Sequence, residues 1–348
     1  MRGCTRLPVV LVVAGAVAGA LAPGAAAGGG EQPAAARNRF GYATPKPRPE
    51  GSIRIATYNV LNLFDDKDDP SLSGEHDDYP QRTSDDRCRG IAAAIREVDA
   101  DVIAMQEVES LEALEWFRDT YLPDAGYAYV ASVDAGYYRG VECSVMSRYE
   151  ITGATVWPGE SLDDVVRTGI GWDEVPADHG PLAYQRSPLM VDIDVAGYEL
   201  TLFVLHHKAG RDFNFHREAE ALRTMAKVRE RIERDPSRNV IVLGDFNAAP
   251  WDRSLRVYLE GGMIDAMAHR TTYRSNPETP LYITHESHRV LDYILLNSAA
   301  HRELVIGSPH VYGTLFDEDY DWKKDPFPAG YAADHYPVIL DLIPHDVP

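Results

Sequence analysis

The sequence is short of cysteine, of positive charge and of long apolar runs. It has three cysteines in 348 residues, and 34 lysines and arginines stand against 54 aspartates and glutamates, for a formal net charge of −20. The cysteines have neither the spacing of a zinc site nor that of a catalytic thiol, and the charge argues against nucleic-acid binding through a broad basic surface. With 45% hydrophobic and 25% charged residues, the composition is that of a globular chain.

The first 27 residues resemble a secretory signal. Arg2 and Arg6 form a basic start, an apolar stretch runs from Leu7 to Ala22, and Ala25 to Ala27 offer a small-residue cleavage site. A membrane span is disfavoured because the apolar stretch falls short of the roughly 20 residues that a span needs. We therefore expect a secreted protein. Loss of Arg2 and Arg6 leaves 32 positive side chains against 54 negative ones, a net charge of −22.

After the signal, residues 28–50 are rich in Gly, Pro and Ala, which predicts a flexible or polyproline-like linker. The sequence beyond shows no repeat and no second linker, so residues 51–345 are predicted to form one domain. Cys4 lies within the signal. Cys88 and Cys143 remain, and in an oxidising compartment they could form a disulfide or stay separate as buried thiols.

Short apolar runs that are typical of strands are mixed with helical stretches throughout this domain. The expected helices cover residues 84–98, 111–121 and 214–234. The expected strands cover residues 53–58, 102–105, 141–146, 189–195, 198–205, 240–243, 291–296 and 338–342. Strands outnumber helices and often follow one another directly. This order favours mixed sheets covered by helices over a strictly alternating parallel sheet.

Polar residues recur where these apolar runs begin or end. Asn59, Gln106-Glu107, His206-His207-Lys208 and Gly244-Asp245-Phe246-Asn247 follow apolar runs, whereas Asp292 and Asp334-His335 precede them. Each has an ordinary explanation when taken alone, such as a surface carboxylate, a turn or a core histidine. Six such segments in one domain instead predict a single converging site, because buried strands place side chains at a sheet edge with good precision.

The same segments resemble the ordered motifs of the endonuclease/exonuclease/phosphatase superfamily. The matching motifs are Thr57-Tyr58-Asn59-Val60, Gln106-Glu107-Val108, His206-His207-Lys208, Gly244-Asp245-Phe246-Asn247, Leu291-Asp292-Tyr293 and Asp334-His335-Tyr336-Pro337. The resemblance covers nearly all of residues 52–343. It implies an α/β (α+β) four-layer sandwich, in which two packed mixed β-sheets are flanked by helices. Ala333 and Ala209 replace the serines that many members carry beside these motifs, which weakens the assignment to a subfamily.

The resemblance also implies a metal-dependent hydrolysis of phosphoesters. Glu107 is the expected metal ligand, with Asn59 beside it and Asp334 contributing. Oxygen ligands suit a hard cation, so Mg²⁺ or Mn²⁺ is the expected cofactor.

Six further residues are expected to act on the substrate. By resemblance, Asp245 orients or deprotonates the attacking water, and Asn247 binds a phosphate oxygen. Asp292 holds His335 in one tautomer, and His335 stabilises phosphoryl charge or transfers a proton. His206, oriented by Glu142, is placed like a general acid of the nuclease branch. Which histidine is acid and which is base stays open.

The substrate is predicted less sharply than the reaction. A secreted nuclease acting on DNA or RNA is the leading hypothesis, with Arg139, Lys208 and Arg211 as substrate-binding cations. Tyr137, Tyr138 and Trp172 could stack on bases. The acidic charge keeps a phosphomonoesterase or a sphingomyelinase-like phospholipid phosphodiesterase as alternatives, and a non-catalytic binding module as a remote one. We expect a monomer without a stable protein partner or membrane contact, because no exposed apolar hairpin stands out.

Three loops are expected to have further roles. Residues 158–184 and 313–331 are expected to border the cleft and to tune substrate choice. The acidic loop from Asp65 to Asp78 could hold a structural Ca²⁺ ion. Its spacing does not match a helix-loop-helix calcium motif, so a solvated acidic loop is the favoured interpretation.

Overall fold

The computed structural model describes residues 36–37, 40–70, 72–167, 171–269, 279–314, 316–317 and 320–345. The predicted signal lies outside these residues. Part of the predicted linker does not extend freely. Phe40 is buried, the Tyr42 amide donates a hydrogen bond to the Val311 carbonyl, and Lys46 Nζ donates to Gly307 O at 2.8 Å. The linker prediction is wrong for residues 40–50, because this segment lies against the domain.

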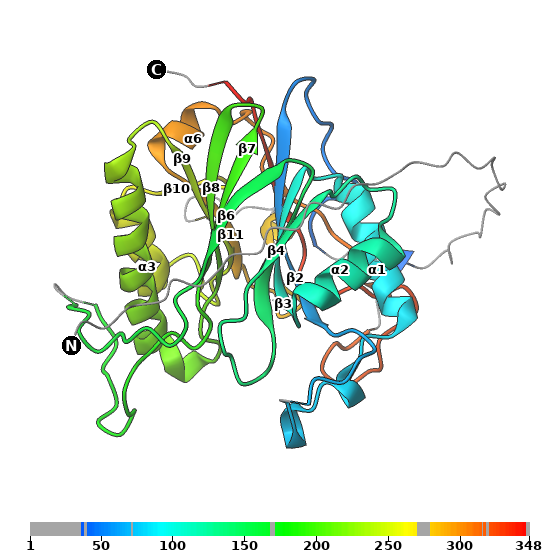
Figure 1. Cartoon of the computed structure of the whole chain (residues 1–348), viewed down its shortest axis with the longest axis horizontal. Coiled ribbons are helices and arrows are strands. Elements are labelled where there is room, and N and C mark those ends of the chain that lie inside the picture. The colour runs from blue at the N-terminus through cyan, green and yellow to red at the C-terminus, as the bar shows by residue number, and fades with distance from the viewer. Residues whose placement is uncertain are drawn as a thin grey trace, which may run out of the picture.

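Two six-stranded mixed sheets form the centre of the molecule (Figure 1). The first sheet has the order β12 (His310–Val311), β14 (Val338–Leu342), β2 (Ile53–Leu63), β3 (Val102–Val108), β5 (Glu142–Ser147) and β4 (Tyr129–Ser132). The second has the order β10 (Ile264–Asp265), β11 (Asp292–Leu296), β9 (Asn239–Asp245), β8 (Tyr198–His206), β7 (Leu189–Val195) and β6 (Glu150–Thr155). β2 runs parallel to β3, and β8 runs parallel to β9. A separate small ribbon pairs β1 (Ala36–Arg37) with β13 (Phe316–Asp317).

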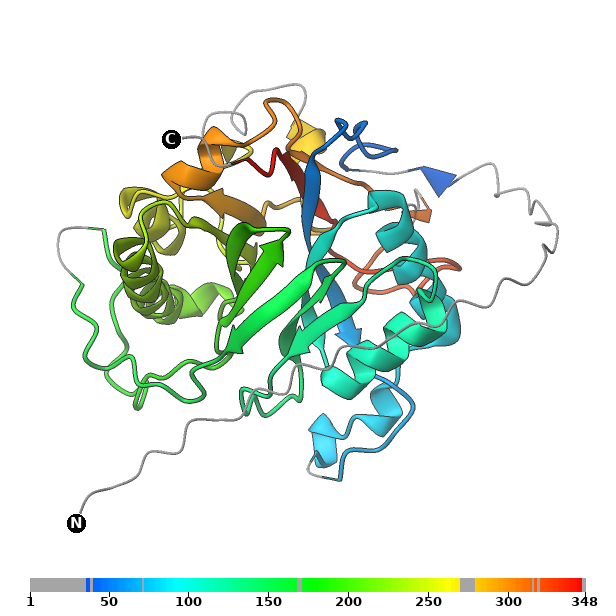
Figure 2. The ribbon, with the colours of Figure 1, turned by 45° about the horizontal axis from the view of Figure 1, so that its top comes forward.

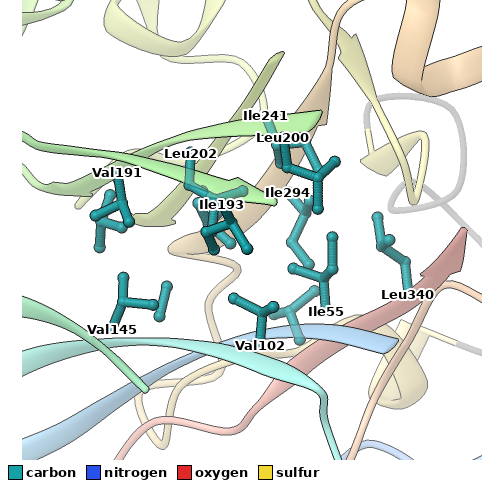
Figure 3. Packing of buried hydrophobic residues seen from close by; sticks show 14 of the residues in the cluster. Ile55, Val102, Val145, Val191, Ile193, Leu200, Leu202, Ile241, Ile294 and Leu340 are labelled. Atoms are coloured by element: carbon teal, nitrogen blue, oxygen red, sulfur yellow. The ribbon is translucent and has the colours of Figure 1, made fainter. Parts of the chain in front are cut away.

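Apolar side chains from both sheets meet between them and form the main core (Figure 3). Ile55, Val102 and Val145 project from the first sheet toward Val191 and Leu202 of the second. All five are fully buried. Burying one such side chain stabilises the fold by about 1.5–3 kcal/mol relative to leaving it exposed. This central layer fixes the two sheets face to face.

Helices cover the outer face of each sheet, and this completes the four layers (Figures 1 and 2). α1 (Asp85–Val98) and α2 (Leu111–Tyr121) lie on the first sheet, and α3 (Asn214–Arg234) lies on the second. Ser84 caps α1 as predicted, because its side chain accepts a hydrogen bond from the Arg87 amide. The predicted four-layer sandwich is confirmed.

Several short elements were not predicted. They are β4, β6, α4 (Arg253–Glu260), α6 (Ser298–Arg302), the two-residue strands, and the short 3₁₀ helices Gly74–His76, Tyr79–Gln81, Arg211–Phe213 and Thr279–Tyr282. β6 contains Gly153 at a register shift against β7, and α4 has only eight residues, so neither shows a clear period. Cys88 and Cys143 are free and buried, which excludes the disulfide alternative. None of the described helices is both long and apolar enough to span a bilayer.

Candidate active site

The ends of β2 and β3 bring Asn59 and Glu107 together. These strands pair in parallel, and the register shifts just after Asn59. Glu107 has a left-handed backbone (φ 65°) at a second register shift, between β3 and β5. Such a bulge turns a side chain away from the regular alternation of the strand. The Glu107 carboxylate consequently accepts hydrogen bonds from the Asn62 amide at 3.1 Å and from Asn59 Nδ2 at 3.5 Å.

In the second sheet, strand register alone gathers three of the predicted catalytic residues. His206 pairs with Asp245 at the ends of the parallel strands β8 and β9, and Asp292 at the start of antiparallel β11 pairs with the same Asp245. The two sheets present their site residues to each other, since Asn59 Nδ2 lies 3.3 Å from Asp245 Oδ2. The prediction of one converging site therefore agrees with the geometry.

Asp245 is the centre of this group. Its Oδ1 accepts a hydrogen bond from the Asn247 amide at 2.8 Å, and its Oδ2 accepts from Asn247 Nδ2 at 3.1 Å. Burial raises the pKa of Asp245, the positive charge of His335 opposes that rise, and the Asp292 carboxylate adds to it. Asn247 has a left-handed backbone (φ 48°), which lets its amide and its side chain both face Asp245.

His335 is held by Asp292 as the sequence predicts. Its Nδ1 lies 2.8 Å from Asp292 Oδ2, and Thr284 Oγ1 donates a hydrogen bond to the same oxygen at 2.7 Å. Burial lowers the pKa of His335, but the carboxylates of Asp292 and Asp245 outweigh it and leave that pKa well above its ordinary value. These two carboxylates favour the protonated form of His335, whose Nε2 lies 3.8 Å from Asp245 Oδ2.

His206 has the opposite electrostatic environment. Its Nε2 lies 3.5 Å from both Glu107 Oε1 and Asp245 Oδ2, while a guanidinium nitrogen of Arg186 lies 2.7 Å from Nε2 and 3.1 Å from Nδ1. Burial and the Arg186 charge together push the pKa of His206 well below its ordinary value. A neutral histidine beside a buried arginine is suited to hold an anion by hydrogen bonding.

Sequence reasoning missed Arg186. This buried residue, three positions before β7, also donates to the His207 carbonyl at 3.1 Å and stacks on Tyr137 at 5.0 Å. The sequence feature that could have indicated Arg186 is its position shortly before an apolar strand, a position that Asp334 and His335 share. The predicted bond from Glu142 to His206 does not appear among the described contacts. Glu142 accepts instead from the Ala135 backbone, and burial raises its pKa to about 8.

The three predicted metal ligands offer an oxygen-rich donor set. Asp334 adjoins His335, and its Oδ1 is buried without a hydrogen-bond partner among the described residues. His285 Nε2 lies 3.4 Å from Asp334 Oδ2. Burial favours a higher pKa for Asp334, but His285 and His335 outweigh this effect and leave its pKa below the ordinary value. Ligand atoms of His285, Asp334 and His335 lie within 4.8 Å of one another. The described contacts join Glu107 to Asn59 and join Asp334 to His285, so the three predicted ligands suit a hard divalent cation by donor type, but no described contact joins Asp334 to the other two.

The predicted substrate-binding cations lie around this centre. Arg139 donates to Asn62 Oδ1 at 2.9 Å, and the Lys208 ammonium lies 4.0 Å over the Phe213 ring. Arg211 lines a cleft of about 730 Å³ that begins at Asn247 and His285. The remaining lining residues are Glu286, Ser287, His288, Arg289, Leu291, Tyr320, Asp321, Trp322 and Lys323.

Of the two loops expected to border the cleft, one does so. Tyr320 to Lys323, within the predicted 313–331 loop, line it. The 158–184 loop packs on α3 through Leu162 and Tyr184 instead, and none of its described residues lines this cleft. Trp172 stacks on Arg253 of α4 at 4.2 Å and does not line it either.

Motif order, fold and site define a metal-dependent phosphoesterase of the sandwich type. The chain belongs to the endonuclease/exonuclease/phosphatase family, whose model matches residues 56–335. The resemblance found in the sequence is thereby confirmed. Members of this family are metal-dependent phosphoester hydrolases, which places the chain among the phosphohydrolases.

Solved structures share the fold at low sequence identity. The human nocturnin catalytic domain matches with a TM-score of 0.55 at 16% identity, over 84% of this chain and 94% of that one. D. rerio TDP2, complexed with a single-strand DNA product, gives 0.53 at 15% identity, over 84% and 99%. A mannosyl-6-phosphatase from Bacteroides thetaiotaomicron gives 0.50 at 19% identity, over 84% and 99%. No curated protein sequence matches the chain.

Proposed function

We propose that this protein is a secreted, divalent-metal-dependent phosphodiester hydrolase that acts as a nuclease. The observation that carries the proposal is the arrangement of two histidines around one carboxylate, in opposite electrostatic environments. His335 lies between the carboxylates of Asp292 and Asp245, which raise its pKa, whereas His206 lies beside Asp245 and the Arg186 guanidinium, which lowers its pKa. Hydrolysis of a phosphodiester needs a base for the water, a donor for the leaving oxygen and positive charge for the phosphoryl oxygens, and these groups supply all three.

Each residue then has a distinct task. Asp245 accepts the proton of the attacking water, and Asn247 hydrogen-bonds a phosphate oxygen. The carboxylates of Asp292 and Asp245 favour the protonated form of His335, which suits this residue to donate a proton to the leaving oxygen. Neutral His206 and cationic Arg186 bind the phosphate. This assigns the acid role to His335 in place of His206. Glu107, Asn59 and Asp334 would hold Mg²⁺ or Mn²⁺, which supplies charge neutralisation when it is bound.

The cleft supports a nucleic-acid substrate. Arg211, Arg289 and Lys323 place three cations along it, and Trp322 adds an aromatic face. Asp321 is engaged by Lys324 Nζ at 2.7 Å, so this carboxylate opposes the cations less than its formal charge implies. Phosphates can be bound by such cations while bases stack on tryptophan. Glu286 and Asp321 also line the cleft, so its cations exceed its carboxylates by one, which favours an anionic ligand there in spite of the overall acidity.

A phosphomonoesterase is the second candidate. The overall acidity favours it, since a small phosphoester carries fewer charges to repel than a nucleic acid. A phospholipid phosphodiesterase is less favoured, because the exposed large apolar side chains, such as Tyr79, Trp251 and Ile306, come from separate segments. The predicted secretion rests on the N-terminal pattern. Recovery of a mature chain beginning near Gly28 from the culture medium would test it.

The deciding experiment is a substrate panel for the mature chain with Mg²⁺, with Mn²⁺ and with EDTA. Plasmid DNA, RNA, bis-nitrophenyl phosphate, sphingomyelin and a phosphomonoester cover the candidates. We expect plasmid nicking and bis-nitrophenyl phosphate hydrolysis that stop in EDTA. Hydrolysis of the monoester alone would replace the nuclease by a phosphatase, and full activity in EDTA would remove the metal from the proposal.

A further inference from the structure

A cluster of carboxylates that is separate from the phosphate-binding residues lies in the loop between β2 and α1. This loop contains the short helices Gly74–His76 and Tyr79–Gln81 and projects from the edge of the domain (Figure 2). Ligand atoms of Asp68, Asp77 and Asp78 lie within 4.8 Å of one another. In the described part of the chain, no lysine or arginine forms an ion pair with any of the three. Three carboxylates this close repel one another unless a cation lies between them.

The burial of Asp78 separates this cluster from an ordinary solvated acidic loop. Asp78 is only 1% exposed, and its Oδ1 is buried without a hydrogen-bond partner among the described residues. Its Oδ2 accepts from the Asp69 amide at 2.9 Å, and the Glu109 carboxyl, whose pKa burial raises to about 8, is hydrogen-bonded to the same side chain. Asp77 Oδ1 is likewise buried and without a partner. A buried carboxylate oxygen normally has a donor or a metal ion to compensate its desolvation.

From this geometry we propose a structural Ca²⁺ site formed by Asp68, Asp77 and Asp78. Calcium takes six to eight oxygen ligands in flexible geometry, so three carboxylates from an irregular loop, completed by backbone carbonyls and water, suit it better than the strict octahedron of Mg²⁺. Two of the ligands are adjacent in sequence and the third lies nine positions earlier. The ion would therefore close the loop on itself.

Closure of this loop also supports the substrate-binding side of the active site. The Leu72 side chain packs against Gly140, where it leaves no room for a Cβ, and the His76 ring lies 4.9 Å from the Tyr138 ring. Tyr138 and Gly140 flank Arg139, which is bonded to Asn62 near Glu107. An ion in the loop would thus hold Arg139 in place without touching the substrate.

The test measures thermal unfolding of the mature chain in a Glu107→Gln background, which weakens cation binding at the catalytic centre. Extracellular calcium sites bind in the range of about 10⁻⁴–10⁻³ M, so about 5 mM Ca²⁺ should raise the Tm by about 2–4 °C. Asp68→Asn combined with Asp77→Asn should abolish this rise. These two side chains are not fully buried, so the variant should fold. Asp66→Asn changes one exposed carboxylate of the same loop and should keep the rise.

Calorimetric titration with CaCl₂ should report one site in the Glu107→Gln chain and none after the double substitution. Absence of a Ca²⁺-dependent rise in the Glu107→Gln chain would overturn the site, as would a rise that survives in the double variant. An equal rise with Mg²⁺ at the same concentration would overturn the calcium assignment. None of these measurements depends on the substrate. A negative result would therefore count against the calcium site without bearing on the proposed nuclease activity.

Discussion

The two ends of the β-sandwich differ in whether their buried charged groups have partners. At the end remote from the active site, Arg54 begins β2 and is 4% exposed, and it pairs with Asp341, which is fully buried, through contacts of 2.8 and 3.1 Å. Its remaining donors reach the Val98 and Lys46 carbonyls, and its amide donates to Asp101. Arg54, Asp341 and Asp101 each have an opposite charge as a partner.

The active-site end leaves comparable groups incomplete. Oδ1 of Asp292 and of Asp334 is buried without a hydrogen-bond partner among the described residues, and the Asp292 carboxylate adds to the rise in the pKa of Asp245. Glu107 and Asn247 also have left-handed backbones. Buried polar groups that a protein leaves unsatisfied are costly to stability, so the difference shows which end is built to hold the fold and which is built to bind.

The largest expected effect follows from removing the neutral histidine of the site. His206→Ala should lower kcat/KM for bis-nitrophenyl phosphate by about 10²–10⁴-fold, because the phosphate loses a buried hydrogen-bond donor. Unfolding curves should show a smaller change, since the polar contacts of His206 are with other residues of the site. A variant that is as active as the wild type would remove His206 from the reaction.

The next prediction concerns the end of the sandwich remote from the active site, where a substitution should reduce stability and leave activity unchanged. Arg54→Met leaves Asp341 buried and uncompensated, which should reduce the free energy of unfolding by about 3–5 kcal/mol. The folded variant should keep its kcat, because Arg54 is remote from the site. Denaturant unfolding and steady-state kinetics measure the two quantities. A large loss of kcat with intact stability would contradict the contrast between the ends.

A smaller, pH-dependent effect concerns Glu142. Burial raises its pKa to about 8 in the folded chain, against an ordinary value of 4.5. The folded state then binds this proton more tightly than the unfolded state, so the stability of the wild type falls between about pH 4.5 and pH 8 from this group. Glu142→Gln cannot ionise and should become progressively more stable than the wild type as the pH rises. Tm values at pH 5 and pH 9 test this, and a difference that does not change with pH would reject it.

Much of the site was predictable because buried strands have a clear sequence pattern. Asn59, Asp245 and Asp292 could be placed at strand ends, and sheet topology then required them to converge. The bulge that reorients Glu107 depends on its left-handed backbone, which no pattern in the residues indicates. Arg186 lies in irregular chain before β7, where no periodicity predicts which side chain turns inward.

The remaining differences between the predictions and the structure lie in segments whose composition is compatible with more than one conformation. A Pro-rich stretch is extended whether it is free in solvent or lies on a domain, so residues 40–50 could not be told from a linker. The cleft cation Arg289 lies in the loop before β11 and Lys323 lies in the loop before β14, and only the fold brings them together. The eight residues of α4 span little more than two turns, too few for a helical period to stand out.

The most direct test compares two buried carboxylates, one at each end of the sandwich. Asp245→Asn and Asp341→Asn make the same chemical change, and each affects a residue that is at most 2% exposed. Hydrolysis of bis-nitrophenyl phosphate with Mg²⁺ should fall by about 10³-fold or more in Asp245→Asn and should be unchanged in folded Asp341→Asn. Equal activity of the two variants would contradict the assignment of Asp245 as the catalytic base.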